Sequence, residues 1–153
     1  MNICFVCSGN TCRSPLAEGL FKYYIAQAGK SDSFTIHSAG TSKNEGNKAS
    51  ENSILAAKEY GVDISNHRSR HLTREVLADT NLILVMTQYH LRWINLNMPE
   101  FKAKSWLLTD YAIAEPWNSS PRDIPDPYGK DIHTYREIAK LINDEIKRIV
   151  KSF

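Results

Sequence analysis

A cysteine and an arginine near the start of the chain have a spacing that could support nucleophilic chemistry. Cys7 and Arg13 are separated by five residues, in the run Cys-Ser-Gly-Asn-Thr-Cys-Arg-Ser-Pro. We expect a thiol beside a helix N-terminus and an arginine to react as a thiolate. The planar guanidinium of Arg13 can hold two phosphate oxygens at once. Together they predict attack by sulfur on phosphorus, with a thiophosphate intermediate.

The residues around this run predict a tight turn from a strand into a helix. Residues 2–6 form a short run that is continuously apolar from Ile3 onward, as in a buried strand. A helix is predicted over residues 15–28, with Ser14 as its N-cap and Pro15 in its first turn. Backbone N–H groups in such a turn bind dianions. The alternative is a buried structural cysteine with Arg13 on the surface, and this strand–loop–helix context argues against it. A nucleotide-binding loop would end in Gly-Lys-Ser/Thr, which is absent here.

A second candidate catalytic group lies far downstream. Asp126 stands between Pro125 and Pro127, which hold it in a stiff, extended segment. A stiff segment suits a general acid that must meet a leaving group in one geometry. The alternative interpretation is an ordinary Asp-Pro turn. The preceding residues 114–124 are rich in Pro, Asn and Ser, and we interpret them as a functional lid.

Strands and helices are predicted to alternate along the chain. Further strands are expected at residues 34–37, 81–86 and 105–108, and further helices at 48–60, from Thr73, from Thr87 to before Pro99, and at 132–151. Residues 38–42 are expected to form a loop. This order predicts an α/β fold: one domain over residues 1–153, built as a three-layer sandwich with a four-stranded parallel sheet and helices on both faces. The active site should lie at the carboxyl ends of the strands, where Cys7 falls.

The composition excludes several classes of protein. The chain has 153 residues, 42% of them hydrophobic, and a formal charge of +2, too small to argue for a nucleic acid or a membrane as partner. No long apolar run or signal stretch is present. The three cysteines fall within the first twelve residues and do not form a secreted disulfide framework, so we expect a cytoplasmic protein. No His or Cys cluster has metal-ligand spacing, and we expect neither metal nor cofactor.

Both segments together resemble one family. Cys7 to Ser14, followed by Pro15, is similar to the signature loop of the low-molecular-weight protein tyrosine phosphatases, and Asp126-Pro127-Tyr128 is similar to that family's second motif. The resemblance covers essentially the whole chain. It implies a cysteine-dependent protein phosphatase whose catalytic residues are Cys7, Arg13 and Asp126. It also implies a phosphorylated protein as substrate, with its phosphate or another oxyanion bound in the loop.

Further residues receive roles in this interpretation. Substrate-binding positions are expected at Ser8, Gly9, Asn10, Thr11, Cys12, Ser14 and Tyr128. Ser14 is expected to donate to the Cys7 sulfur and help it leave, and Asn10 to shape the loop in a left-handed conformation.

The family implies three supporting roles. Ser38 would support the loop through Asn10, and His67 would send a hydrogen bond towards it. Cys12 would form a reversible disulfide that protects Cys7 from further oxidation. The open alternatives are that Ser38 is an ordinary turn residue and that His67 belongs to a solvated basic loop.

The chain departs from the tyrosine-specific pattern at the substrate pocket. Eukaryotic tyrosine-specific members have a large aliphatic residue at the position of Thr11, an aromatic residue in the loop that matches residues 42–44, and two tyrosines after Asp-Pro. Here that loop offers Lys43 and Asn44, and Tyr128 is followed by Gly129. A threonine resembles the bacterial members that act on phosphoarginine in proteins. We therefore favour phosphoarginine, while a strictly phosphotyrosine-specific phosphatase stays open.

Two rival functions lack support in the sequence. An arsenate reductase on this fold needs two further cysteines downstream, and none follows Cys12. A non-enzymatic phosphoprotein-binding module would be expected to lack the nucleophile or the acid, whereas Cys7, Arg13 and Asp126 are all present.

Overall fold

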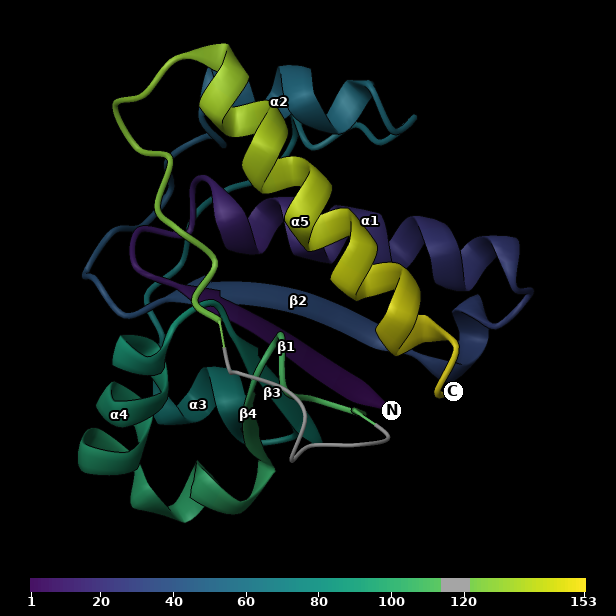
Figure 1. The fold of residues 1–153 in the computed structure, drawn as a ribbon. Helices are drawn as coiled ribbons and strands as arrows, with labels where there is room; N and C mark the ends of the chain where they lie inside the picture. Colours follow the sequence, from purple (N-terminus) through teal and green to yellow (C-terminus); the bar gives the residue numbers. More distant parts are fainter. Residues whose placement is uncertain (114–121) are drawn as a thin grey trace.

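The strands form one parallel sheet, as the alternation of elements predicts. A computed structural model describes residues 1–113 and 122–153. Within them the strand order is β2-β1-β3-β4 (Figure 1), with β1 at Asn2–Cys7, β2 at Thr35–Gly40, β3 at Leu82–Val85 and β4 at Ser105–Leu107. Most of the predicted lid, residues 114–121, lies outside the described residues.

Helices cover both faces of this sheet. In Figure 1, α1, α2 and α5 lie on one face, and α3 and α4 lie on the other. Their bounds are α1 Arg13–Gln27, α2 Glu51–Lys58, α3 Arg74–Leu77, α4 Gln88–Asn97 and α5 Ile132–Val150, with short 3-10 turns η1 Ser31–Ser33 and η2 Pro99–Lys104. The predicted three-layer α/β architecture is confirmed.

Side chains of the central strand β1 pack into both halves of the core. Ile3, Phe5 and Cys7 pack into the cluster beneath α1 and α5, while Cys4 and Val6 pack into the cluster beneath α4. This alternation follows from the period of two in a strand. It leaves Cys7 at the carboxyl end of the sheet, on the side of α1. Burial raises the pKa of the Cys4 thiol, which keeps Cys4 a neutral core residue.

The start of α1 differs from the prediction. The helix begins at Arg13, and its N-cap is Cys12, whose side chain makes no capping hydrogen bond. The prediction of Ser14 as the N-cap was therefore wrong. The Ser14 hydroxyl contacts Cys7 and Asn10 instead, so a tertiary contact outweighs the local capping preference of serine.

Two other elements also differ from the prediction in their bounds. Residues 38–40, predicted as loop, extend β2 because they pair in parallel with residues 5–7 of β1. The second helix is shorter than expected: Ser50 caps it by accepting from Ser53 N, and it ends at Lys58. The predicted helix starts at Thr73 and Thr87 are confirmed, and the structure shows both threonines as N-caps whose side chains accept a backbone N–H.

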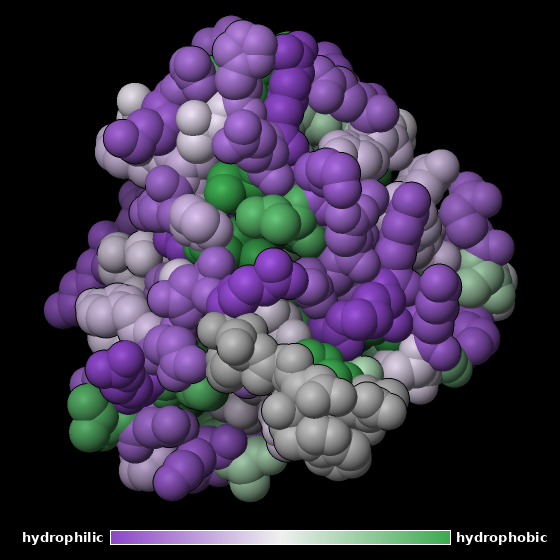
Figure 2. Space-filling model, in the orientation of Figure 1, coloured by the Kyte–Doolittle hydropathy of each residue, from purple (hydrophilic) through white to green (hydrophobic). Residues whose placement is uncertain are grey.

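The face shown in Figure 2 is mainly hydrophilic, with apolar side chains in small groups between polar ones. Among the residues that the structure describes, no helix is both long and apolar enough to cross a membrane.

Candidate active site

The loop from Cys7 to Arg13 turns its carbonyl oxygens away from its centre. Each of its first five carbonyls accepts a hydrogen bond from another segment; the donors, in order, are Thr41 N at 3.0 Å, Ser42 N at 3.0 Å, Asn44 Nδ2 at 2.7 Å, His67 Nε2 at 2.7 Å and Ser50 N at 2.8 Å. In a planar trans peptide the N–H points opposite to the C=O. The amides that follow these carbonyls are thus turned to the inner side of the loop. Such a ring of N–H groups is suited to an anion.

The tight path of the loop depends on two residues. Asn10 has a φ of 54°, the left-handed conformation that asparagine tolerates better than most residues. Gly40, at the end of β2, lies directly behind the loop, where a Cβ atom would stand 2.3 Å from Ser8 O. A side chain at position 40 would therefore push the loop out of shape.

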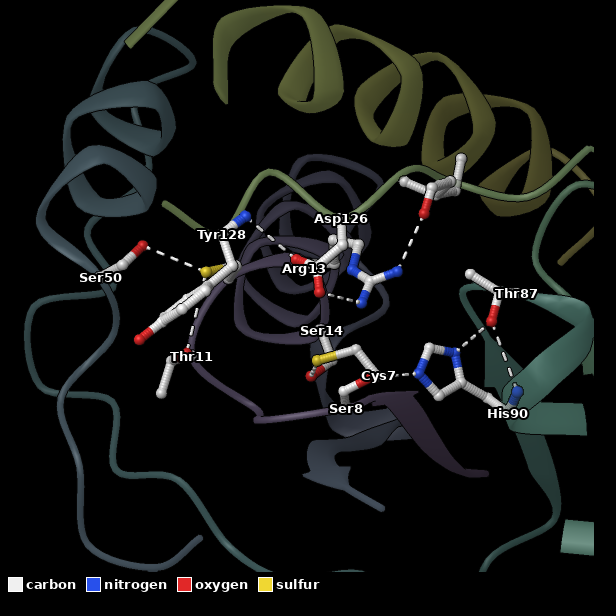
Figure 3. Close-up of polar contacts among 12 residues, drawn as sticks. Cys7, Ser8, Thr11, Arg13, Ser14, Ser50, Thr87, His90, Asp126 and Tyr128 are labelled. Carbon is white, nitrogen blue, oxygen red and sulfur yellow. Dashed lines mark hydrogen bonds and ion pairs between the residues drawn. The ribbon is translucent and has the colours of Figure 1, made fainter. Parts of the chain in front are cut away.

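A chain of hydrogen bonds runs from α1 to the Cys7 sulfur. Ser38 Oγ lies 2.6 Å from Glu18 Oε2, Asn10 Nδ2 donates to both Ser38 Oγ at 2.9 Å and Ser14 Oγ at 2.8 Å, and Ser14 Oγ lies 2.9 Å from Cys7 Sγ. A carboxylate only accepts, so Ser38 donates to Glu18 and accepts from Asn10. Ser14 likewise accepts from Asn10, which leaves its own proton for the Cys7 sulfur (Figure 3).

Arg13 offers a buried guanidinium at the same loop. Its side chain is 3% exposed; Nη1 donates to Ile124 O at 3.0 Å, and Nη2 forms an ion pair with Asp126 Oδ2 at 3.2 Å. Its Nε is buried and has no hydrogen-bond partner among the described residues. A buried donor without a partner costs free energy. An anion in the loop could satisfy it.

Residues 124–128, which carry the candidate acid Asp126, lie against the loop at its Arg13 end. Ile124 N donates to Met86 O at 2.8 Å, which ties this segment to the end of β3. Asp126 is about half exposed and accepts from Tyr128 N at 3.1 Å. The Tyr128 ring is 76% exposed. The segment therefore presents one carboxylate and one aromatic ring at the open side of the site.

These groups surround a cavity of about 330 Å³. It is lined by residues of the loop except Asn10, together with Ser42, Asn44, Asp126 and Tyr128. The predicted residues Ser8, Gly9, Thr11 and Cys12 thus share the cavity with the three candidate catalytic residues. The side chains of Asn10, Ser14, Ser38 and His67 lie behind the loop, where they hold its shape. Among the described residues, no group of three or more His, Cys, Asp or Glu side chains could hold a metal ion.

Cys12 is a buried free thiol on the inner wall of the loop. Its Sγ lies 3.4 Å from both Ser50 Oγ and Tyr135 OH. Burial, and then the contact with Cys12, raise the pKa of Tyr135 to about 12, so the phenol stays protonated.

Sequence reasoning missed several residues that contact the loop or its supports, among them Glu18, His90 and Tyr135. Glu18 lies one helical turn after Ser14, a spacing that could have suggested it. His90 and Tyr135 come from α4 and α5, and no local pattern points either side chain at the loop. Burial, together with the positive charge of Arg13, lowers the pKa of His90 to about 4, so its ring is neutral near pH 7.

Comparison with known proteins agrees with this geometry. The family model described as low molecular weight phosphotyrosine protein phosphatase matches residues 2–153. A protein-arginine-phosphatase of Bacillus subtilis is 32% identical over 151 residues, covering 99% of this chain and 95% of the relative. The low molecular weight protein-tyrosine-phosphatase Ptp of Acinetobacter johnsonii is 38% identical over 141 residues, covering 92% and 89%. A solved structure, a mutant of the YwlE arginine phosphatase with a phosphorylated active-site serine, superposes with a TM-score of 0.90 at 30% identity, covering 99% of this chain and 95% of that one.

Proposed function

The chain belongs to the low molecular weight phosphotyrosine protein phosphatase family, and we propose that it removes phosphate from phosphorylated arginine side chains of proteins. The enzyme class, a cysteine-dependent protein phosphatase, follows from the family. The choice of side chain and the roles of the individual residues form the proposal.

In the first step, the Cys7 thiolate attacks the phosphorus atom. An S–P bond forms as the bond from phosphorus to the leaving nitrogen or oxygen breaks. The inward amides and Arg13 hold the three equatorial oxygens, over which negative charge spreads. A substrate phosphoryl group that binds the Arg13 guanidinium would compete with Asp126, which pairs with Arg13 Nη2 at 3.2 Å. Released from Arg13, the Asp126 carboxylate takes up a proton from solvent and then gives that proton to the leaving nitrogen or oxygen.

In the second step, water cleaves the thiophosphate. Asp126, now a carboxylate, takes a proton from the water as its oxygen attacks phosphorus. The S–P bond breaks, and the electron pair returns to the Cys7 sulfur. Ser14, whose hydroxyl lies 2.9 Å from Cys7 Sγ, stabilises the departing thiolate by donating its proton to a hydrogen bond.

The observation that carries the substrate assignment is the polar wall around Thr11. The Thr11 side chain shares the cavity with Ser42, Asn44 and the Asp126 carboxylate, and Tyr128 supplies the single aromatic ring among the described lining residues. A leaving guanidine is planar, cationic once protonated and rich in N–H donors. The Thr11 and Ser42 hydroxyls, the Asn44 amide and the Asp126 carboxylate offer oxygens that can accept hydrogen bonds from such a group.

The test compares hydrolysis of a phosphoarginine peptide with that of a phosphotyrosine peptide of the same sequence. We expect the wild type to have the higher kcat/KM on phosphoarginine and Thr11→Ile to reverse the order. Thr11→Val is the matched control, because it removes the hydroxyl with almost no change in volume. A wild type that prefers phosphotyrosine, with a ratio that Thr11→Ile leaves unchanged, would refute the assignment.

Phosphotyrosine is the second candidate. It is favoured by the exposed Tyr128 ring at the cavity, which could stack on a phenyl group, and by the relative from Acinetobacter johnsonii named as a tyrosine phosphatase. Tyr128→Ala separates the two. It should lower activity on a phosphotyrosine peptide more than on phosphoarginine if the ring serves as a stacking wall.

The proposal places the enzyme in the cytoplasm, where free thiols persist. Fractionation of cells that express the natural chain would test this location.

A further inference from the structure

His90 joins helix α4 to the catalytic loop through two hydroxyl groups. Its ring is 1% exposed. Nε2 lies 2.9 Å from Ser8 Oγ, and Nδ1 lies 2.9 Å from Thr87 Oγ1. Ser8 directly follows the nucleophile and lines the cavity, and Figure 3 shows it between Cys7 and His90. None of the mechanistic steps above uses His90.

The hydrogen bonds around Thr87 indicate which ring nitrogen carries the proton. Thr87 Oγ1 caps α4 by accepting the backbone N–H of His90 at 3.4 Å. Within residues 1–113 and 122–153, the one acceptor in hydrogen-bond contact with the Thr87 hydroxyl is Nδ1. Because Thr87 Oγ1 already accepts this backbone N–H, whereas Ser8 Oγ has no other donor among its contacts in the described residues, we infer that the Thr87 hydroxyl donates to Nδ1 and that Nδ1 is unprotonated. A neutral imidazole has one N–H, so the proton lies on Nε2.

This tautomer decides what the Ser8 hydroxyl can do. With the proton on Nε2, His90 donates to Ser8 Oγ, and the proton of Ser8 is not spent on the ring. With the proton on Nδ1, Ser8 would have to donate to the ring and would have no proton left for a ligand. We propose that His90 is a positioning residue that makes Ser8 a hydrogen-bond donor to the bound phosphoryl group, beside the loop amides. This inference rests on the proposed phosphatase function.

The proposal can be tested by the binding of inorganic phosphate, measured by calorimetry and as competitive inhibition of para-nitrophenyl phosphate hydrolysis. Ser8→Ala and His90→Leu should each weaken phosphate binding by roughly tenfold, the size expected for one hydrogen bond to a charged group. The double variant should bind no more weakly than the weaker single variant, because both changes remove the same contact. His90→Gln should restore most of the affinity, since its amide N–H can take the place of Nε2–H.

A matched control is His37→Gln. His37 is a partly buried histidine on β2 that, like His90, contacts a threonine hydroxyl, with Nε2 3.5 Å from Thr80 Oγ1, and it lies outside the cavity. Its replacement should leave phosphate binding unchanged. Wild-type affinity in His90→Leu, or losses that add up in the double variant, would overturn the proposal.

A second measurement uses only the wild type, so it does not depend on the folding of a variant. Long-range ¹H–¹⁵N spectra of the wild type distinguish Nε2–H from Nδ1–H in a neutral imidazole. We expect Nε2–H for His90, and the opposite tautomer would overturn the proposal. A wild type that neither binds phosphate nor hydrolyses the aryl phosphate would instead remove the proposed function itself. A wild type that does both, with unaffected Ser8 and His90 variants, would remove the role of His90 alone.

Discussion

Replacing Asn10 tests how the catalytic loop is held in shape. The Asn10 side chain donates to Ser14 Oγ at 2.8 Å and to Ser38 Oγ at 2.9 Å, and it accepts from Arg70 N at 3.0 Å. The residue is fully buried and has a φ of 54°. Asn10→Ala removes three hydrogen bonds, each worth about 1 kcal/mol. It also places alanine in a left-handed conformation, at a cost of about 1 kcal/mol. We expect the free energy of unfolding to fall by roughly 4 kcal/mol.

The assay is equilibrium unfolding in urea, with the hydrolysis of para-nitrophenyl phosphate measured on the same samples. Asn10→Gly removes the same hydrogen bonds but accepts the positive φ, so it should be roughly 1 kcal/mol less destabilising than Asn10→Ala. Asn66→Ala is the surface control, since Asn66 is exposed, and it should change stability by less than about 0.5 kcal/mol. Activity should fall in both Asn10 variants, because Ser14 loses the donor that directs its proton to Cys7. An Asn10→Ala variant as stable and active as the wild type would refute this reasoning.

Three further predictions follow from the site. Asp126→Ala should slow turnover by roughly a hundredfold or more on poor leaving groups and much less on para-nitrophenyl phosphate, and an equal loss on both would contradict its role as the acid. After peroxide treatment, thiol reduction should restore the activity of the wild type, because its Cys7 sulfenic acid condenses with the Cys12 thiol to a reducible disulfide with loss of water. In Cys12→Ser, peroxide can oxidise the Cys7 sulfenic acid further to a sulfinic acid that thiols do not reduce, so activity should not return. Equal recovery in the two proteins would argue against this protection. Because the folded state holds the pKa of His90 near 4, against about 6.5 when unfolded, the unfolded chain binds more protons between these values. The free energy of unfolding should therefore rise by roughly 3 kcal/mol from pH 4 to pH 6.5, and His90→Gln should flatten that slope.

The sequence predicts well whatever depends on local spacing. The apolar run before Cys7 and the residues after it were enough to predict a strand, a tight loop and a helix. The alternation of elements was enough to predict a parallel sheet, and the aspartate between two prolines pointed to the acid segment. These features need only neighbouring residues and the rules of strand and helix connection.

The remainder depends on contacts between segments that are distant in sequence. Ser14 has the local features of an N-cap, yet its hydroxyl contacts the Cys7 sulfur because α1 begins at Arg13. Residues 38–40 have turn-like character, yet pairing with β1 makes them strand. A helix was predicted to start at Thr87, but only the packing of α4 against the sheet brings His90 to Ser8. Local propensities cannot predict where such side chains point.

The central claim is that Cys7 carries the phosphoryl group during turnover, and trapping that intermediate tests it most directly. The protein would be mixed with excess para-nitrophenyl phosphate, quenched rapidly, digested and analysed by mass spectrometry. We predict a single phosphoryl group on the peptide that contains Cys7, and its loss when the quench is delayed until the substrate is consumed. Turnover without any phosphoryl group on Cys7, or undiminished turnover by Cys7→Ser, would contradict the claim.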